Sequence, residues 1–281
     1  MNKIIIIIPI FKINLTDFEI ISVKRAITIL SGQQEIIFIH PKSLELSNYY
    51  LNFPEIILYK NFDDFYFSSI TGYNNLLLSS FFYENFLNYD YMLIYQTDCY
   101  IFENNLTFWA DKEYDYIGGV WFENFTSNPY DGAKMSYPGN GGFSLRKVKS
   151  CYDLITSNSR IKSCKDILAE YKAKKKQINY LIIFFKILIK YFSKKNIYKY
   201  CAKRYRNNED VFFIEEGRFL KTFSIPDVNE AINFSWDRCP KYLLDINKKL
   251  PMGCHAWFRN DFPYEGNLNF WKTIINSNQK N

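Results

Sequence analysis

The sequence predicts an α/β fold with a mostly parallel central sheet, because strand-like and helical segments alternate over roughly its first 120 residues. Residues 4–10 and 35–40 are continuous apolar runs rich in Ile, typical of strands that are buried on both faces. The chain has 281 residues, of which 48% are hydrophobic and 23% charged, enough for one large core. We therefore expect a single domain over residues 1–281.

The individual elements follow from local start and stop signals. A helix begins at Thr16, whose spacing to Glu19 forms a capping box, and Gly32 ends this helix. The other predicted elements are, in chain order, strands at 56–59, 91–95 and 116–120, helices at 72–86 and near Trp109, a glycine-rich turn at 139–142 and a strand-like piece at 222–225. This alternation is typical of a doubly wound sheet, in which ligands bind at the carboxyl ends of the strands.

Segment lengths and cysteine spacing exclude several protein classes. Residues 4–8 imitate the apolar part of a signal peptide, but Pro9 and Lys12 interrupt them and no small-residue cleavage site follows. No segment offers about 18 uninterrupted apolar residues, so we expect no membrane-spanning helix. The six cysteines form no C-x-x-C pair, which predicts free thiols and a cytoplasmic protein.

Positive charge is concentrated in residues 160–206, which carry 15 Lys and Arg against two acids. This segment has a net charge of +13, so the rest of the chain has a net charge of −7. From Lys172 to Lys194 polar residues recur at a period near 3.5, beside a wide apolar face. We interpret residues 160–206 as a basic helical insertion within the domain.

Two environments suit the apolar face of this insertion. One is an anionic membrane surface, contacted by residues 172–206, and the other is the protein's own domain, with the lysines in water. Residues 178–192 would form a helix of roughly 22 Å, too short and too charged to cross a bilayer. Nucleic acid is not an expected partner, because the aromatic side chains do not interleave with basic ones on an exposed platform. The membrane interpretation places the protein on the inner face of the cytoplasmic membrane.

Two candidate sites lie in the first half of the chain. The segment Gln96-Thr97-Asp98 follows the strand at 91–95, where a carboxylate can hold Mg²⁺ or Mn²⁺ between the phosphates of a nucleotide, or can act as a turn residue. In residues 138–146, three glycines in four positions let backbone N–H groups approach a ligand, and Arg146 can meet an anion. An ordinary turn between a strand and a helix explains these glycines equally well.

Two further candidates lie in the second half. Glu209 and Asp210 precede an apolar run, either as the first turn of a helix or with one of them as a general base. His255 lies in a glycine-containing turn, where its imidazole can ligate a metal or contact a phosphate. The other histidine, His40, ends a buried strand, so we assign it a structural role. A zinc site is not expected, since no second His or paired Cys accompanies His255.

The order of these motifs resembles a family of bacterial glycosyltransferases of the GT-A fold, long known as a domain of unknown function. The resemblance extends over about residues 71–257, apart from the basic insertion. It rests on Tyr-Gln-x-Asp-Cys-Tyr at 95–100, Gly-Asn-Gly-Gly-Phe-Ser-Leu-Arg at 139–146, Asn-Glu-Asp at 208–210 and Gly-Cys-His-Ala-Trp at 253–257. The implied fold is a GT-A-like, Rossmann-like single domain.

The resemblance also implies roles for individual residues. A nucleotide-sugar donor, UDP-linked, is bound with its base near the end of the first strand. Asp98 and His255 are the implied ligands of Mn²⁺ or Mg²⁺, whereas Gln96 departs from the Asp-x-Asp element at its first acidic position. Of the acidic pair Glu209 and Asp210, the second is the implied base. The implied nucleotide-sugar-binding residues are Pro9, Ile10, Phe11, Gln96, Thr97, Asp98, Gly141 and Gly142.

The activity implied is an inverting, metal-dependent hexosyl or pentosyl transfer to a glycan or lipid-linked acceptor, in the synthesis of a bacterial capsule or lipooligosaccharide. Two other functions stay open. The +13 segment is compatible with a non-catalytic module that binds membranes or nucleic acid. The substitution of an acid by Gln96 is compatible with a degenerate transferase fold that binds glycans without turnover.

Overall fold

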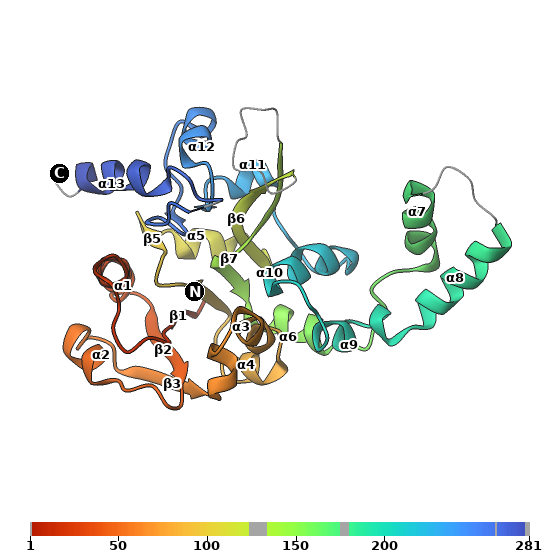
Figure 1. Ribbon diagram of the computed structural model, residues 1–281, viewed down its shortest axis with the longest axis horizontal. Coiled ribbons are helices and arrows are strands. Elements are labelled where there is room, and N and C mark those ends of the chain that lie inside the picture. The colour runs from red at the N-terminus through yellow and green to blue at the C-terminus, as the bar shows by residue number, and fades with distance from the viewer. Residues whose placement is uncertain (1, 124–133, 175–179, 262, 279–281) are drawn as a thin grey trace.

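A central β-sheet organises this computed structural model, which describes residues 2–123, 134–174, 180–261 and 263–278 (Figure 1). Over these residues the strand order is β3-β2-β1-β4-β7-β6-β8-β9-β5. The strands are β1 (Ile4–Pro9), β2 (Glu35–Pro41), β3 (Leu58–Phe62), β4 (Tyr91–Tyr95), β5 (Tyr100–Ile101), β6 (Tyr116–Phe122), β7 (Met135–Lys147), β8 (Ser235–Trp236) and β9 (Gly253–Cys254). Strands β3, β2, β1 and β4 are parallel, whereas β7 pairs antiparallel with β4 and β6. The predicted α/β domain with a mostly parallel sheet is confirmed.

Helices pack on both faces of this sheet, and one pair of them projects from the body (Figure 1). They are α1 (Asp17–Leu30), α2 (Ser47–Asn52), α3 (Ile70–Leu77), α4 (Ser80–Glu84), α5 (Leu106–Asp111), α6 (Val148–Thr156), α7 (Cys164–Lys174), α8 (Tyr180–Phe192), α9 (Tyr198–Ala202), α10 (Glu209–Val211), α11 (Val228–Ala231), α12 (Pro240–Asn247) and α13 (Asn267–Asn278). The predicted capping box of α1 is present: the Thr16 hydroxyl accepts from the Glu19 N–H, and the Glu19 carboxylate accepts from the Thr16 N–H at 2.9 Å.

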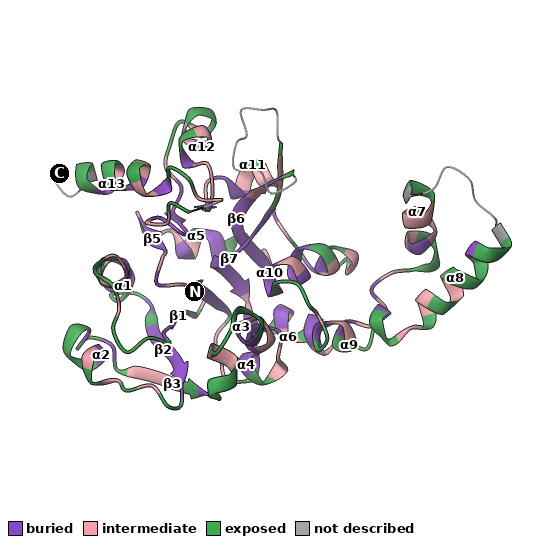
Figure 2. Cartoon of the chain, in the orientation of Figure 1, coloured by how far each residue is buried: buried purple, intermediate pink, exposed green. Residues whose placement is uncertain are grey.

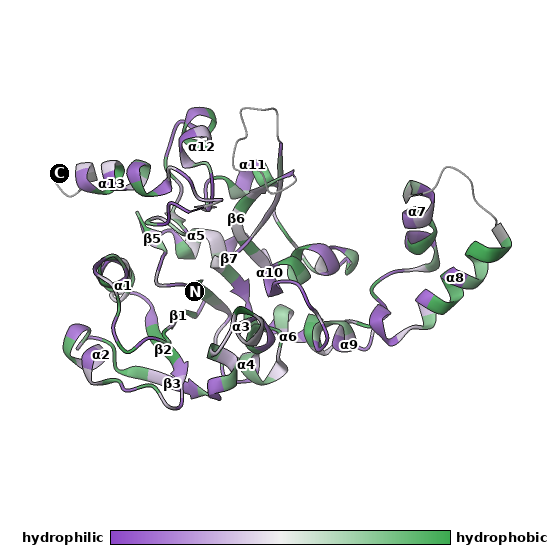
Figure 3. Ribbon diagram, in the orientation of Figure 1, coloured by the Kyte–Doolittle hydropathy of each residue, from purple (hydrophilic) through white to green (hydrophobic). Residues whose placement is uncertain are grey.

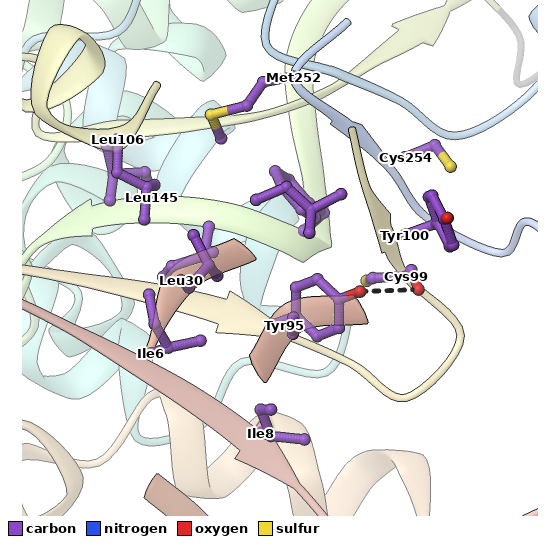
Figure 4. Close-up of a cluster of buried hydrophobic side chains, with 14 of the residues drawn as sticks. Ile6, Ile8, Leu30, Tyr95, Cys99, Tyr100, Leu106, Leu145, Met252 and Cys254 are labelled. Atoms are coloured by element: carbon purple, nitrogen blue, oxygen red, sulfur yellow. Dashed lines mark hydrogen bonds between the residues drawn. The ribbon is translucent and has the colours of Figure 1, made fainter. Parts of the chain in front are cut away.

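The core lies on both sides of the sheet, which explains the uninterrupted Ile run of β1. Ile4, Ile6 and Ile8 belong to one buried cluster, and Ile5 and Ile7 to a second cluster on the opposite face. Figure 4 shows part of the first cluster, where the Tyr95 hydroxyl donates to the Cys99 carbonyl at 3.1 Å. Figure 2 shows the resulting buried centre of the sheet. The predicted strand without a solvent-exposed face is confirmed as β1, which ends at Pro9, one residue earlier than predicted.

The predicted glycine-rich turn at 139–142 is wrong, because these residues continue the long strand β7. Glycine serves here for close approach of backbones: a Cβ on Gly118 of β6 would lie 2.1 Å from the Asn140 carbonyl oxygen. The pairing of β6 with β7 also shifts register in this region. A sequence with several neighbouring glycines is typical of a turn, but an irregular strand pair needs them as well.

Two other predicted elements differ from the structure. The helix at 72–86 is divided into α3 and α4, because the Ser79 hydroxyl accepts from the Phe82 N–H and caps a new helix. Residues 222–225 form no strand, although the Ser224 carbonyl accepts from the Asp115 N–H at 2.8 Å. Residues 56–59 overlap β3, which begins two residues later than predicted.

The basic insertion forms a helical arm in its middle part only. Helices α7 and α8 project from the body of the molecule (Figure 1). Tyr198 and Ala202 of α9, near the end of the insertion, are instead buried in the core. Residues 175–179, which belong to the helix predicted from Lys172, lie outside the described residues. Of the helices that the structure describes, none combines the length and apolarity required to span a membrane.

Candidate active site

A cavity of about 750 Å³ opens at the carboxyl ends of β1 and β4. Most of the residues singled out in the sequence line this cavity, although they come from distant parts of the chain. They are Pro9, Phe11, Gln96, Thr97, Asp98, Gly141, Gly142, Glu209, Asp210 and His255. This is the edge of an open α/β sheet at which ligands bind, so the structure places these residues around one cavity at that edge.

Three strand ends meet around His255. Asp98 follows β4, His255 follows β9 and Asp237 follows β8. The Nε2 atom of His255 lies 3.2 Å from Asp98 Oδ1, and its Nδ1 atom lies 2.8 Å from Asp237 Oδ1. Gln96 Oε1 lies 3.1 Å from the same Nε2 atom. The structure thus brings Asp98 and His255 into contact, as the metal prediction requires.

The electrostatics of this cluster are dominated by two carboxylates that flank one imidazole. Although burial alone would lower it, the pKa of His255 is raised to about 10 by Asp98 and Asp237. Burial opposes ionisation of Asp98, yet the charge of His255 and its hydrogen bond hold the pKa of this carboxyl below its ordinary value. The two carboxyl groups therefore favour the protonated form of the His255 imidazole.

The donor atoms of this cluster suit a hard or borderline divalent cation. One carboxylate, one imidazole nitrogen and one amide oxygen converge, and Asp237 holds the opposite ring nitrogen of His255, as second carboxylates do for metal-ligating histidines. In the described part of the chain no three His, Cys, Asp or Glu side chains gather as a metal site. The Gln96 amide oxygen, 3.1 Å from His255 Nε2, is a further oxygen beside Asp98 and His255.

Glu209 and Asp210 are adjacent in sequence but have different surroundings. Glu209 Oε1 lies 2.6 Å from Arg146 Nη2, and both side chains are buried. Asp210 Oδ2 accepts from the Gly141 N–H at 3.0 Å, and its Oδ1 accepts from the Val211 N–H at 2.7 Å. Burial, together with the charge of Glu209, raises the pKa of Asp210 to about 8. Glu209 is thus held in an ion pair, whereas Asp210 forms no ion pair with a described residue and is held by backbone N–H groups.

The two predicted glycines of the site do not offer free backbone donors. The Gly141 N–H donates to Asp210, and the Gly142 N–H donates to Asn140 Oδ1 at 3.0 Å. Their lack of a side chain has a different use: a Cβ on Gly142 would lie 2.3 Å from the His255 ring. Gly142 therefore makes room for the histidine rather than for a ligand contact through its N–H.

The predicted nucleotide-binding residues of β1 divide between cavity and core. Pro9 and Phe11 line the cavity, whereas Ile10 is buried in the hydrophobic core beneath it. Thr97 donates to the buried Glu19 at 2.9 Å, so its hydroxyl is used in fixing the loop after β4. Ile10 thus supports the cavity without lining it.

Several cavity residues were not predicted from the sequence. Lys12 and Arg259 supply positive charge at the cavity, and Lys12 also pairs with Glu19 at 2.8 Å. Tyr73 lines the cavity with a buried hydroxyl that has no hydrogen-bond partner among the described residues. Asp237 follows a strand of only two residues, and an acid at the end of such a short strand gives no recognisable signal in the sequence.

Solved structures with an overall arrangement similar to this chain include glycosyltransferases. The apo form of mouse xyloside xylosyltransferase 1 is 9% identical, with a TM-score of 0.48, over 90% of this chain and 97% of that chain. The galactosyltransferase LgtC, in complex with donor and acceptor sugar analogs, is 12% identical, with a TM-score of 0.48, over 97% of this chain and 95% of that chain. The core-mannan synthase A of Aspergillus fumigatus, in its Mn/GDP form, is 8% identical, with a TM-score of 0.41, over 75% of this chain and 68% of that chain.

Sequence comparison gives a more specific result. No curated protein sequence is significantly similar to this chain. The model of one protein family, described as a protein of unknown function (DUF5672), matches residues 57–255. These residues include β4, β7, the acidic pair and His255, that is, most of the cavity described above. The chain belongs to the DUF5672 family.

Proposed function

We propose that this protein is a glycosyltransferase that moves a sugar from a nucleotide-sugar donor to a hydroxyl of an acceptor. The observation that carries this proposal is the convergence of Asp98, His255 and Asp210 on one cavity at the carboxyl ends of the strands. Such a reaction needs a positive group beside the leaving diphosphate and a base beside the acceptor. The cavity supplies candidates for both.

On the donor side, Asp98, His255 and the Gln96 amide are the residues that would hold Mn²⁺ or Mg²⁺. A bound divalent ion would stabilise the negative charge that the leaving diphosphate gains. Lys12 and Arg259 add positive charge at the same cavity and can bind phosphate oxygens directly. Pro9 and Phe11 offer an apolar surface for the base at the end of β1, and a UDP-linked sugar is the proposed donor.

On the acceptor side, Asp210 is the proposed general base. Its oxygens are oriented by the N–H groups of Gly141 and Val211, and a pKa of about 8 suits a group that must take a proton near neutral pH. The acceptor hydroxyl loses its proton to Asp210 as its oxygen bonds to the anomeric carbon. The bond from that carbon to the diphosphate oxygen breaks, and the sugar is transferred with inversion.

The biological setting belongs to the same proposal. The acceptor is a glycan or a lipid-linked glycan in the synthesis of a bacterial surface polysaccharide, such as a capsule or a lipooligosaccharide. This setting rests on the resemblance of the ordered motifs to bacterial glycosyltransferases. A cytoplasmic location is supported by the six free cysteines, several of them buried, which fit a reducing compartment.

The test is a transfer assay with a panel of nucleotide sugars and Mn²⁺, read as release of nucleoside diphosphate. Asp98→Asn should abolish metal-dependent nucleotide binding, and Asp210→Asn should lower turnover by roughly 10²–10⁴ with little change in donor affinity. Asp153→Asn is the matched control, since Asp153 is exposed and forms a surface ion pair with Lys149.

The stereochemistry and the alternative function have their own outcomes. NMR of the product should show an inverted anomeric configuration, and a retained configuration would remove Asp210 from the role of base. If the wild type and the variants all bind glycan without consuming the nucleotide sugar, that result would favour a degenerate transferase fold, with which Gln96 in place of an acid is compatible.

A further inference from the structure

The arm formed by α7 and α8 leaves an apolar helix face uncovered. On α8, Phe185, Ile189 and Phe192 have exposed fractions of 57%, 72% and 65%. They recur at spacings of four and three residues, so they lie on one face of the helix. Figure 3 shows α8 as a strongly hydrophobic segment that stands away from the body. A contiguous apolar surface of this kind marks a site of interaction.

The opposite face of α8 packs on α7. Ile183 is buried, Ile187 is half-buried, and Lys190 lies 2.5 Å from Glu170 of α7. These three residues share the spacing of the exposed set but point the other way. Lys190 of the predicted polar stripe therefore contacts α7, and the apolar residues of the first set face outward.

The base of the arm is held firmly, so the direction of the exposed face is set by the fold. The Arg160 guanidinium lies 4.4 Å from the Tyr191 ring centroid, and Arg160 Nη1 donates to the Tyr191 carbonyl at 2.5 Å. The buried Asn196 side chain donates to the carbonyls of Lys162 and Tyr191 at 2.9 and 3.2 Å. Because this end of the arm is already ordered, binding of a partner costs little conformational entropy there.

Basic side chains surround the apolar face. Lys186 is exposed on α8 beside it, and Lys194, Lys195 and Lys199 are exposed at the base of the arm. The segment 160–206 has a net charge of +13. A second copy of this face would bring these lysines together, whereas a negatively charged surface would neutralise them.

We propose that the α8 face of Phe185, Ile189 and Phe192 inserts into the interfacial region of an anionic lipid bilayer. The helix lies in the plane of the interface, with its aromatic and aliphatic side chains at the boundary of headgroups and acyl chains and with the lysines beside the lipid phosphates. This attachment is independent of the proposed glycosyl transfer, because it uses no residue of the cavity.

The test is co-sedimentation of the full chain with vesicles of equal parts phosphatidylglycerol and phosphatidylcholine. Phe185→Ser/Ile189→Ser should lower the bound fraction at a given lipid concentration by about tenfold or more. Leu51→Ser/Ile57→Ser is the matched control, since these two side chains are 79% and 83% exposed on the body, and it should bind as the wild type does.

The charge contribution is tested separately. Lys194→Glu/Lys195→Glu should weaken binding to the anionic vesicles, and wild-type binding should fall as salt is added. Equal binding of the wild type to pure phosphatidylcholine vesicles would overturn the anionic part of the proposal.

Two other results would overturn the proposal as a whole. One is vesicle binding by Phe185→Ser/Ile189→Ser that equals wild-type binding. The other is a wild-type dimer in analytical ultracentrifugation that this variant dissociates, without any vesicle binding, which would make a second copy the partner of the face. Circular dichroism and thermal melting check that the variants are folded, and donor hydrolysis is measured independently of all these outcomes.

Discussion

Asp210 shows how burial gives one of two neighbouring acids a distinct chemistry. Glu209 is neutralised by Arg146, whereas Asp210 lines the cavity and accepts hydrogen bonds from the Gly141 and Val211 N–H groups. Burial and the charge of Glu209 raise the pKa of Asp210 from 3.8 to about 8. The unfolded chain therefore releases the Asp210 proton at a lower pH than the folded chain does. Its contribution to the free energy of unfolding is full below about pH 4 and is lost as the pH rises to about 8.

The variant Asp210→Asn removes this pH dependence, because the asparagine side chain does not ionise. We expect the melting temperature of Asp210→Asn, relative to the wild type, to be higher at pH 8 than at pH 4. Scanning calorimetry at a series of pH values measures this difference. A difference that does not change between pH 4 and pH 8 would show that Asp210 is ionised normally in the folded protein.

Gly142 carries a second residue-level prediction, because its missing side chain leaves room for the His255 ring. Gly142→Ala should displace this ring and destabilise the protein by about 1–3 kcal/mol, as overpacking of a buried site does. Urea denaturation measures the loss, and Mn²⁺-dependent nucleotide binding should weaken in parallel. Gly32→Ala is the control, since a Cβ on Gly32 would meet no atom within 4 Å. Equal stability of the two variants would contradict the packing seen here.

At the scale of elements, the cluster depends on the ends of β4, β8 and β9 meeting at one edge of the sheet. Asp237, at the end of β8, touches the ring nitrogen of His255 that faces away from Asp98. We therefore expect Asp237 to orient the His255 ring. Asp237→Asn should weaken Mn²⁺-dependent nucleotide binding by about 10–100-fold.

Isothermal titration with nucleoside diphosphate and Mn²⁺ measures this effect. Nucleotide binding without metal should change little in Asp237→Asn, whereas a merely unfolded variant would lose both. Asp153→Asn again serves as the control. If Asp237→Asn binds nucleotide in the presence of Mn²⁺ as the wild type does, the contact of Asp237 with His255 is not needed for metal-dependent binding.

At the scale of the whole molecule, the arm is an appendage whose two ends lie side by side in the body. The Arg160 backbone pairs with that of Ile197, and the Lys162 N–H donates to Asn196 Oδ1 at 2.9 Å. We expect that residues 164–193 can be replaced by a short Gly-Ser linker with little change in melting temperature, because α7 and α8 pack mainly on each other. The donor hydrolysis of this shortened protein should equal that of the full chain.

A larger deletion is the informative comparison. Removal of residues 172–206 would also take Tyr198 and Ala202 out of the core, so this variant should unfold at a lower temperature. If the 164–193 replacement unfolds as well, the arm is part of the cooperative unit of the domain.

The sequence by itself determined the alternation of strands and helices, the double burial of β1 and the start of α1, because these depend on local patterns of apolar and capping residues. It also determined which chemical groups the cavity contains, since Asp98, Asp210 and His255 stand out by residue type and position. Only the tertiary structure decided their surroundings. Which of two adjacent acids is neutralised depends on Arg146, 63 residues away, and the orientation of His255 depends on Asp237, 18 residues away at the end of another strand. Likewise, the glycines of β7 indicate a turn until β6 lies beside them, because close approach of two strands is a property of the pair and not of either segment.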